Sequence, residues 1–171
     1  MRNTIAALAA VFGATSAMAA DLPGKSAPAA PSPIFASKSF YAGVNGGGIV
    51  TDGISVDTPW TVGLVGGYNV SNIGPVAVSV EGTYDYSKNK TNDVAGNIVG
   101  GYSFGSVTPY ALVGVGYRFA DFRNEAIWNV GVGVKIAVTS SIDVDTRYRR
   151  VDNFDRNIGE DRVTIGVNYK F

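Results

Sequence analysis

The chain has 171 residues, with 14 lysines and arginines against 14 aspartates and glutamates, 22 glycines, and neither cysteine nor histidine. The lack of cysteine and histidine excludes disulfide scaffolds, Cys/His zinc sites and every catalytic triad or dyad that needs histidine. The balanced charge and a sequence pI of about 6.2 argue against a nucleic-acid-binding protein, and 46% apolar residues with only 16% charged argue against a disordered chain.

Residues Met1–Ala19 have the three parts of a secretory signal peptide. Arg2 supplies the positive charge, Ile5–Phe12 the apolar segment, and Ala17-Met18-Ala19 the small-residue cleavage site. The alternatives are a core helix and a membrane anchor, but the apolar segment is too short to span a bilayer as a helix. We expect export and a mature chain that begins at Ala20 or Asp21.

Residues 20–38 form the second expected region, a tail rich in proline and alanine. Asp21–Lys38 holds four of the seven prolines. Such a composition cannot bury a core, and proline favours extended conformations. A ligand for a proline-binding module is the alternative, and a linker is the simpler interpretation.

From Ser39 onward the sequence alternates apolar and polar residues with a period of two, which indicates β-strands. The clearest case sets Val76, Val78 and Val80 on one face against Ala77, Ser79 and Glu81 on the other. The predicted strands are Phe40–Val50, Trp60–Asn69, Val76–Tyr86, Val94–Phe104, Val107–Phe119, Ala126–Val138, Ile142–Arg150 and Arg162–Phe171.

The connections between these strands alternate between short turns and longer polar loops, as in an up-and-down meander. Residues 39–171 allow about 17 residues for each of eight strands with its connection, whereas sixteen strands would leave about eight, fewer than a membrane-spanning strand needs. The sequence predicts an all-β fold, an eight-stranded antiparallel up-and-down transmembrane β-barrel over residues 39–171, and excludes a large porin.

The polar face decides which side of the barrel meets lipid. It consists mainly of Gly, Ala, Ser, Thr and Asn with few charges, whereas a water-exposed surface would be richer in Lys and Glu. Small residues suit the crowded bore of a narrow barrel. Aromatic residues near the strand ends fit the two interfacial girdles of a membrane barrel. An aromatic-rich soluble barrel is the alternative.

An outward apolar face places a set of ionisable side chains in the bore, where they must pair or stay hydrated. Parity of the register predicts that Lys135 faces either Asp143 or Asp145 and forms an ion pair. Asp143 and Asp145 together could suggest acid–base chemistry or a calcium site, but nearby basic residues favour ion pairing. The set serves either as a structural plug, which we favour, or as an ion path; it comprises Glu81, Asp85, Arg118, Lys135, Asp143, Asp145, Arg147, Arg149, Arg162 and Lys170.

Several segments resemble small Gram-negative outer-membrane β-barrels, most of all the porin-like and opacity-type group common in alphaproteobacteria. They are Ala20-Asp21-Leu22-Pro23, the Pro/Ala tail, Phe40-Tyr41-Ala42-Gly43, Thr108-Pro109-Tyr110 and the closing Val167-Asn168-Tyr169-Lys170-Phe171. The resemblance implies an outer-membrane location, contact with membrane lipid and lipopolysaccharide, and roles in envelope integrity and surface interaction. It also implies that the barrel-assembly machinery reads Val163, Ile165, Val167, Tyr169 and Phe171. The loops are shorter than is usual for surface adhesins of this group.

We therefore expect a non-enzymatic barrel with a periplasmic tail, no catalytic set, no cofactor, no metal and no nucleic-acid partner. Its surface cations could meet lipopolysaccharide phosphates, although exposed, solvated loops are the explanation we favour; they are Lys88, Lys90, Arg123, Arg150 and Arg156. The alternatives are a narrow channel for small solutes or ions, a lipid-modifying or proteolytic enzyme, and a soluble periplasmic lipid carrier.

Overall fold

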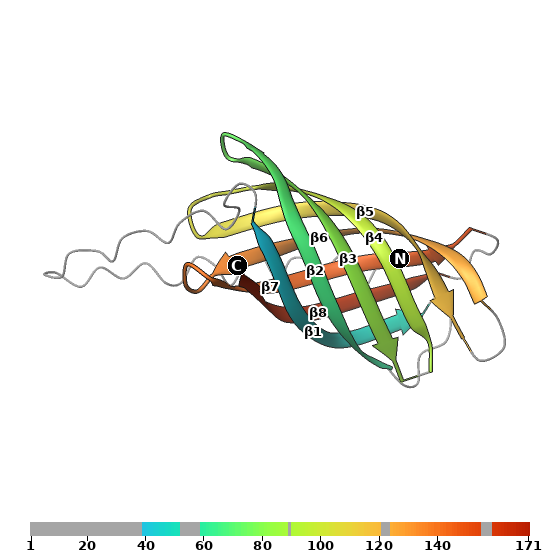
Figure 1. Cartoon of the computed structure of the whole chain (residues 1–171). Coiled ribbons are helices and arrows are strands. Elements are labelled where there is room, and N and C mark those ends of the chain that lie inside the picture. Colours follow the sequence, from blue (N-terminus) through green and yellow to red (C-terminus); the bar gives the residue numbers. More distant parts are fainter. Residues whose placement is uncertain (1–38, 52–58, 89, 121–123, 155–158) are drawn as a thin grey trace, which may run out of the picture.

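The computed structural model describes residues 39–51, 59–88, 90–120, 124–154 and 159–171. These residues form one closed barrel in which each strand is antiparallel to its two neighbours and β8 pairs with β1 (Figure 1). The predicted eight-stranded up-and-down fold is confirmed. The strands are β1 (Phe40–Thr51), β2 (Trp60–Ile73), β3 (Val76–Ser87), β4 (Asn92–Tyr102), β5 (Val107–Phe119), β6 (Asn124–Ala137), β7 (Ile142–Asn153) and β8 (Glu160–Lys170).

Several predicted features lie outside the described residues. The signal peptide over residues 1–19 and the tail over residues 20–38 are among them, and so are Arg123 and Arg156.

Strand boundaries differ from the predicted ones mainly where a strand ends in polar residues. β4 begins at Asn92 and β8 at Glu160, each two residues earlier than the apolar alternation indicates, and β7 continues to Asn153. β2 runs to Ile73 after an irregularity between Asn69 and Ser71. An apolar pattern marks only the part of a strand that needs an apolar face, whereas the hydrogen-bonded ladder continues beyond it.

The register fixes the width of the barrel. Starting at Tyr41 and stepping through register partners from strand to strand, the path returns to β1 at Thr51, ten residues further along. A shear of this size in an eight-stranded barrel goes with strands tilted by roughly 35–45° and with an interior that side chains fill.

The two faces of the sheet are sharply divided. On β3, side chains from Ala77 to Asp85 alternate between buried and exposed positions without a break. Val80, Val132 and Ile165 are exposed by 47%, 45% and 61%, on the outside of the barrel. The buried residues are largely polar, so the interior is a hydrogen-bonded core and the apolar surface is the exterior.

The two ends of the barrel differ. The β2–β3, β4–β5 and β6–β7 connections are tight, and Gly74 and Gly105 adopt φ values of 62° and 63° that favour glycine. This short-turn end also holds the start of β1 and the end of β8, as Figure 1 shows by the C label. The opposite end, here the loop end, carries the other connections. Among the described residues no helix is long and apolar enough to cross a membrane.

Candidate functional site

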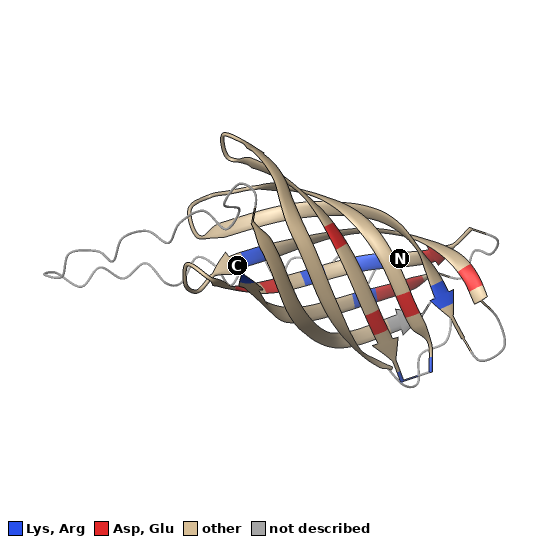
Figure 2. Ribbon diagram, viewed as in Figure 1, with Lys and Arg blue, Asp and Glu red and all other residues tan. Residues whose placement is uncertain are grey.

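The barrel interior holds the candidate site. Nine of the ten predicted inward-facing ionisable residues are exposed by 9% or less, and the side chain of the tenth, Arg118, is 11% exposed. Figure 2 shows the acidic and basic positions distributed along the strands of the barrel. Ion pairs join eight of these residues into two clusters, and Asp143 and Lys170 lie apart at the short-turn end.

The central cluster is built around one ion pair that crosses the bore. Arg147 on β7 donates from both terminal nitrogens to the carboxylate of Glu81 on β3, with Nη2 3.1 Å from Oε2. β3 and β7 are four strands apart in either direction round the barrel. Arg147 also donates to Asp145, with Nη2 2.7 Å from Oδ2. The pair therefore ties opposite walls together with the two-pronged geometry that makes Arg–carboxylate bonds strong.

Two tyrosines complete the central cluster from opposite sides. Tyr41 donates its hydroxyl to Glu81 at 3.0 Å, and Tyr110 donates to Asp145 at 2.6 Å while accepting from Arg147 Nε at 2.8 Å. The tyrosine rings lie against glycine on the next strand: a Cβ added at Gly67 would lie 2.2 Å from Cζ of Tyr41, and one added at Gly133 would lie 2.4 Å from Cζ of Tyr110. Glycine at these two positions makes room for the rings.

Lys135 also belongs to the central cluster. Its register partner on β7 is Asp145, one of the two positions that parity allowed. Its Nζ lies 4.0 Å from Oε2 of Glu81 and 4.2 Å from the centroid of the Tyr41 ring. The ammonium group of Lys135 thus lies beside the Glu81 carboxylate, a contact that the register of the β6–β7 hairpin alone does not predict.

A second cluster lies nearer the loop end. Arg118 binds Asp93 through two bonds of 2.8 and 2.9 Å and binds Glu160 through bonds of 3.1 and 2.9 Å. Arg162 on β8 reaches across to Asp93 on β4 and also donates to Glu160. The loop-end cluster comprises Asp85, Asp93, Arg118, Arg149, Glu160 and Arg162.

The sequence analysis missed two acidic residues of the loop-end cluster, Asp93 and Glu160. Both fall in predicted connections, yet Asp93 is the second residue of β4 and Glu160 is the first residue of β8, two strands that begin earlier than predicted. Parity was the available signal: Asp93 lies directly opposite Arg118, and Glu160 is two residues before the inward-facing Arg162. Tyr41 and Tyr110 were also missed, because the sequence analysis assigns aromatic residues to the outer girdles of the barrel and not to its interior.

Asp143 and Lys170 lie at the short-turn end. Asp143 accepts a hydrogen bond from Asn168 Nδ2 at 2.7 Å and is not grouped with Asp145, whose partners are Arg147 and Tyr110. Within the described part of the chain no group of three or more acidic side chains is arranged to hold a metal ion.

Among the described residues, the charges on the inward face of the barrel balance. The acids are Glu81, Asp85, Asp93, Asp143, Asp145 and Glu160, and the bases are Arg118, Lys135, Arg147, Arg149, Arg162 and Lys170. Each carboxylate in the two clusters has a basic partner within 4.0 Å. A neutral, cross-linked interior can hold opposite walls of a barrel together, because the charges within each cluster compensate one another.

The outer surface carries aromatic pairs near both ends. Phe40–Tyr68, Tyr102–Phe104 and Tyr169–Phe171 lie at the short-turn end, with ring centroids 4.6, 4.5 and 5.1 Å apart. Trp60–Tyr86 and Tyr117–Phe119 lie at the loop end, at 5.9 and 5.2 Å. Two such belts separated by aliphatic side chains are typical of a barrel that spans a bilayer.

The remaining predicted residues lie on the outside. Among the surface cations, Lys88 and Lys90 are exposed, and Arg150 lies at the loop end, where its Nη1 is 3.2 Å from Asp161. The predicted assembly signal forms the outer face of β8 and its end; Val163, Ile165, Val167, Tyr169 and Phe171 are exposed by 49–77%.

Comparison with known proteins supports a membrane barrel. A family model described as an outer membrane protein β-barrel domain matches residues 5–171. No curated protein matches the chain.

Solved structures of similar shape include Neisserial surface protein A, with 18% identity, 77% of this chain and 97% of that chain covered, and a TM-score of 0.55. The N-terminal β-barrel domain of Pseudomonas aeruginosa OprF has 13% identity, covers 79% and 98%, and has a TM-score of 0.57. The outer membrane enzyme PagL has 13% identity, covers 75% and 98%, and has a TM-score of 0.52. These likenesses show the fold alone.

Proposed function

The chain belongs to the outer membrane protein β-barrel domain family and lies in the outer membrane, and from this premise we propose that it is a non-enzymatic structural protein of the envelope whose lumen is closed by side chains. The observation that carries the proposal is the Glu81–Arg147 pair, which joins β3 to β7 across the bore. The loop-end cluster adds a second crossing between β4 and β8 through Asp93 and Arg162.

The energetics favour a closed lumen. Separating a buried ion pair leaves two uncompensated charges, and removal of one partner of such a pair typically costs about 3–5 kcal/mol. An ion that enters the bore must displace Arg147 from Glu81, from Asp145 and from the Tyr110 hydroxyl. The central cluster is therefore a barrier rather than a path.

Reconstitution into planar lipid bilayers tests this proposal. The protein is first checked by gel mobility with and without boiling, because a folded barrel that resists detergent runs differently in the two lanes. We expect membranes that contain folded protein to show no discrete conductance steps. Regular steps from the unchanged protein would overturn the closed lumen.

A narrow channel is the second candidate, and one observation favours it. Within the described residues, several buried interior polar atoms have no hydrogen-bond partner, including both amide atoms of Asn97, Oδ1 of Asn45 and Nε of Arg149. Buried polar atoms of this kind are usually hydrated. Water at these atoms would leave only the two ion-pair clusters as a barrier to ions. The bilayer recording distinguishes the two candidates directly.

The absence of enzymatic activity is part of the proposal. One structure of similar shape is an enzyme, but at 13% identity it supports only the fold, and the present chain has no histidine. Incubation of the purified protein with lipopolysaccharide and phospholipid should release no fatty acid. Measurable deacylation that purifies with the barrel would refute this part.

Orientation and export complete the proposal. Short turns of outer-membrane barrels face the periplasm, so we place the short-turn end and the tail of residues 20–38 there, after removal of residues 1–19. Sequencing of the mature N-terminus should begin at Ala20 or Asp21. The outward residues of β8 would serve the assembly machinery, and exposed Lys88 and Lys90 would lie near lipopolysaccharide phosphates.

A further inference from the structure

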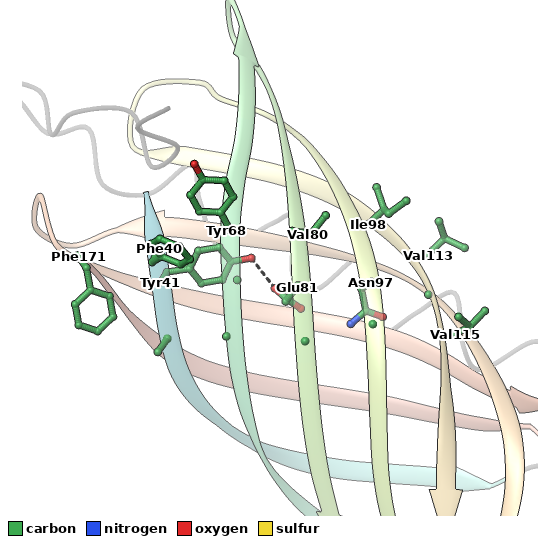
Figure 3. Close-up of a pocket in the computed structure, with 16 residues that line it drawn as sticks. Phe40, Tyr41, Tyr68, Val80, Glu81, Asn97, Ile98, Val113, Val115 and Phe171 are labelled. Atoms are coloured by element: carbon green, nitrogen blue, oxygen red, sulfur yellow. Dashed lines mark hydrogen bonds between the residues drawn. The ribbon is translucent and has the colours of Figure 1, made fainter. Parts of the chain in front are cut away.

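One groove on the outside of the barrel has no role in the proposed function. Its floor is a row of four small, exposed residues that are direct register partners on consecutive strands: Ala42 on β1, Gly66 on β2, Gly82 on β3 and Gly96 on β4. Larger outward side chains line one side, and in Figure 3 Val80, Ile98 and Val113 follow one another across the strands. The groove has a volume of about 960 Å³, within the usual range of small-ligand sites.

The chain itself gives no steric reason for the three glycines of this floor. A Cβ added at Gly66 or Gly96 would meet nothing within 4 Å, and one at Gly82 would meet only a backbone oxygen at 3.9 Å. The inward-facing Gly67 and Gly133, in contrast, are required by tyrosine rings. Glycine weakens a strand, and within strands it often marks a place where a ligand approaches the backbone. The missing side chains leave room for something outside the chain.

The width of the groove limits what fits it. The row of small residues is flanked on both sides by outward side chains, four residues apart on the same strand, for example Phe40 and Val44 on β1, which places their Cα atoms about 13 Å apart. The wall side chains take up part of that width. The opening that remains is narrower than an α-helix with its side chains, which measures about 10–12 Å, and narrower than the convex face of a second barrel. A single hydrocarbon chain fits.

The direction and length of the groove point to one leaflet. It begins beside Phe40, Tyr68 and Phe171, in the aromatic belt of the short-turn end, which marks the headgroup level. It ends at Val115, the register partner of Gly96. From Ala42 to Gly96 it crosses three interstrand spacings, about 14 Å. Because the strands are tilted by roughly 35–45°, this row runs obliquely and stays within half of a hydrocarbon core of about 30 Å.

We propose that this groove holds one acyl chain of a phospholipid from the leaflet at the short-turn end. The proposal rests on the outer-membrane location and is independent of whether the lumen conducts. The phospholipid is a bound partner of β1–β4 rather than part of the fluid bilayer. The row of small residues does not continue beyond β1–β4, because the next register partners are large: Val115 on β5 opposite Gly96, Trp128 on β6 opposite Val115, and Tyr169 on β8 opposite Ala42.

Native mass spectrometry of the folded full-length protein in detergent, with dipalmitoyl phosphatidylethanolamine as probe, tests the proposal. We expect one phospholipid to remain bound under activation that removes all others. The double variant Gly66→Val, Gly82→Val fills the groove and should weaken binding by at least about tenfold. Gly100→Val is the matched control, because Gly100 is an exposed β4 glycine with equally open space that does not line the groove, and it should retain the phospholipid.

Further outcomes are informative. The single-chain palmitoyl lysophosphatidylethanolamine should bind comparably, whereas glycerophosphoethanolamine, which lacks acyl chains, should not bind. Equal retention by the double variant and by Gly100→Val would overturn the proposal, and so would a wild-type dimer that the double variant abolishes, since the occupant would then be a second copy. If the double variant does not fold, Gly82→Ala provides the graded test, with weaker binding expected than in the wild type.

Discussion

Glu81 and Arg147, which pair across the bore, occupy equivalent places on opposite sides of the barrel. Glu81 is the register partner of Gly67, which faces Tyr41. Arg147 is the register partner of Gly133, which faces Tyr110. The same row of tyrosine, glycine and charged residue thus occurs twice, four strands apart, with the acid in one row and the base in the other. The row on β1–β3 therefore supplies the acid of the pair that crosses the bore, and the row on β5–β7 supplies its base.

Arg147→Met should destabilise the barrel by about 3–5 kcal/mol, because Glu81 and Asp145 would remain buried without their main partner. Adding Glu81→Gln to this variant should recover part of the loss. The measurement is urea unfolding in phospholipid vesicles. Arg150→Met, which removes a partly exposed cation, is the control and should cost less than about 1 kcal/mol. Equal losses for Arg147→Met and Arg150→Met would contradict the role of the cluster.

Gly67→Ala should destabilise the barrel by about 1–3 kcal/mol, because its Cβ would lie 2.2 Å from Cζ of Tyr41. Gly66→Ala is a control one residue away, where a Cβ meets nothing within 4 Å, and its free energy of unfolding should match the wild type or exceed it slightly. Tyr41→Ala should remove most of the difference between the two alanine variants. If Gly67→Ala and Gly66→Ala have the same free energy of unfolding while Tyr41 is present, the Tyr41 ring does not require glycine at position 67.

Asp93→Asn removes one of the two acids that Arg118 and Arg162 share, yet it should not produce conductance steps in planar bilayers. The central cluster lies further along the bore and still crosses it through Glu81 and Arg147. A triple variant that also carries Glu81→Gln and Arg147→Met should conduct if it folds. Steps from Asp93→Asn alone would show that the loop-end cluster is the sole barrier.

Ile165→Lys should cost about 2–4 kcal/mol in vesicles, because this 61% exposed residue lies on the outer face in the middle of β8, and a lysine at the bilayer midplane is unfavourable by that amount. Val138→Lys is the matched control. It is also 61% exposed but follows the end of β6 at the short-turn end, so its cost should be about 0–1 kcal/mol. Similar costs at both positions would argue against the assigned depth.

The sequence predicted the part of the site that depends on local alternation. The side of the sheet on which Glu81 and Lys135 lie follows from the period of two. Parity limits the register partner of Lys135 to Asp143 or Asp145, and the structure gives Asp145. Contacts across the bore, such as Glu81 with Arg147, could not be predicted, because they depend on the shear and tilt of the closed barrel. Asp93 was missed because the apolar pattern stops before the ladder does.

The pairing of β1 with β8 joins residues near the two ends of the described chain, with eleven register pairs from Tyr41–Lys170 to Thr51–Glu160. Contacts between residues so distant in sequence form slowly, since the whole intervening chain must be ordered first. The barrel therefore cannot close before β8 has been made, and until then β1 has an open edge. The newly made chain must be kept from aggregating throughout that interval.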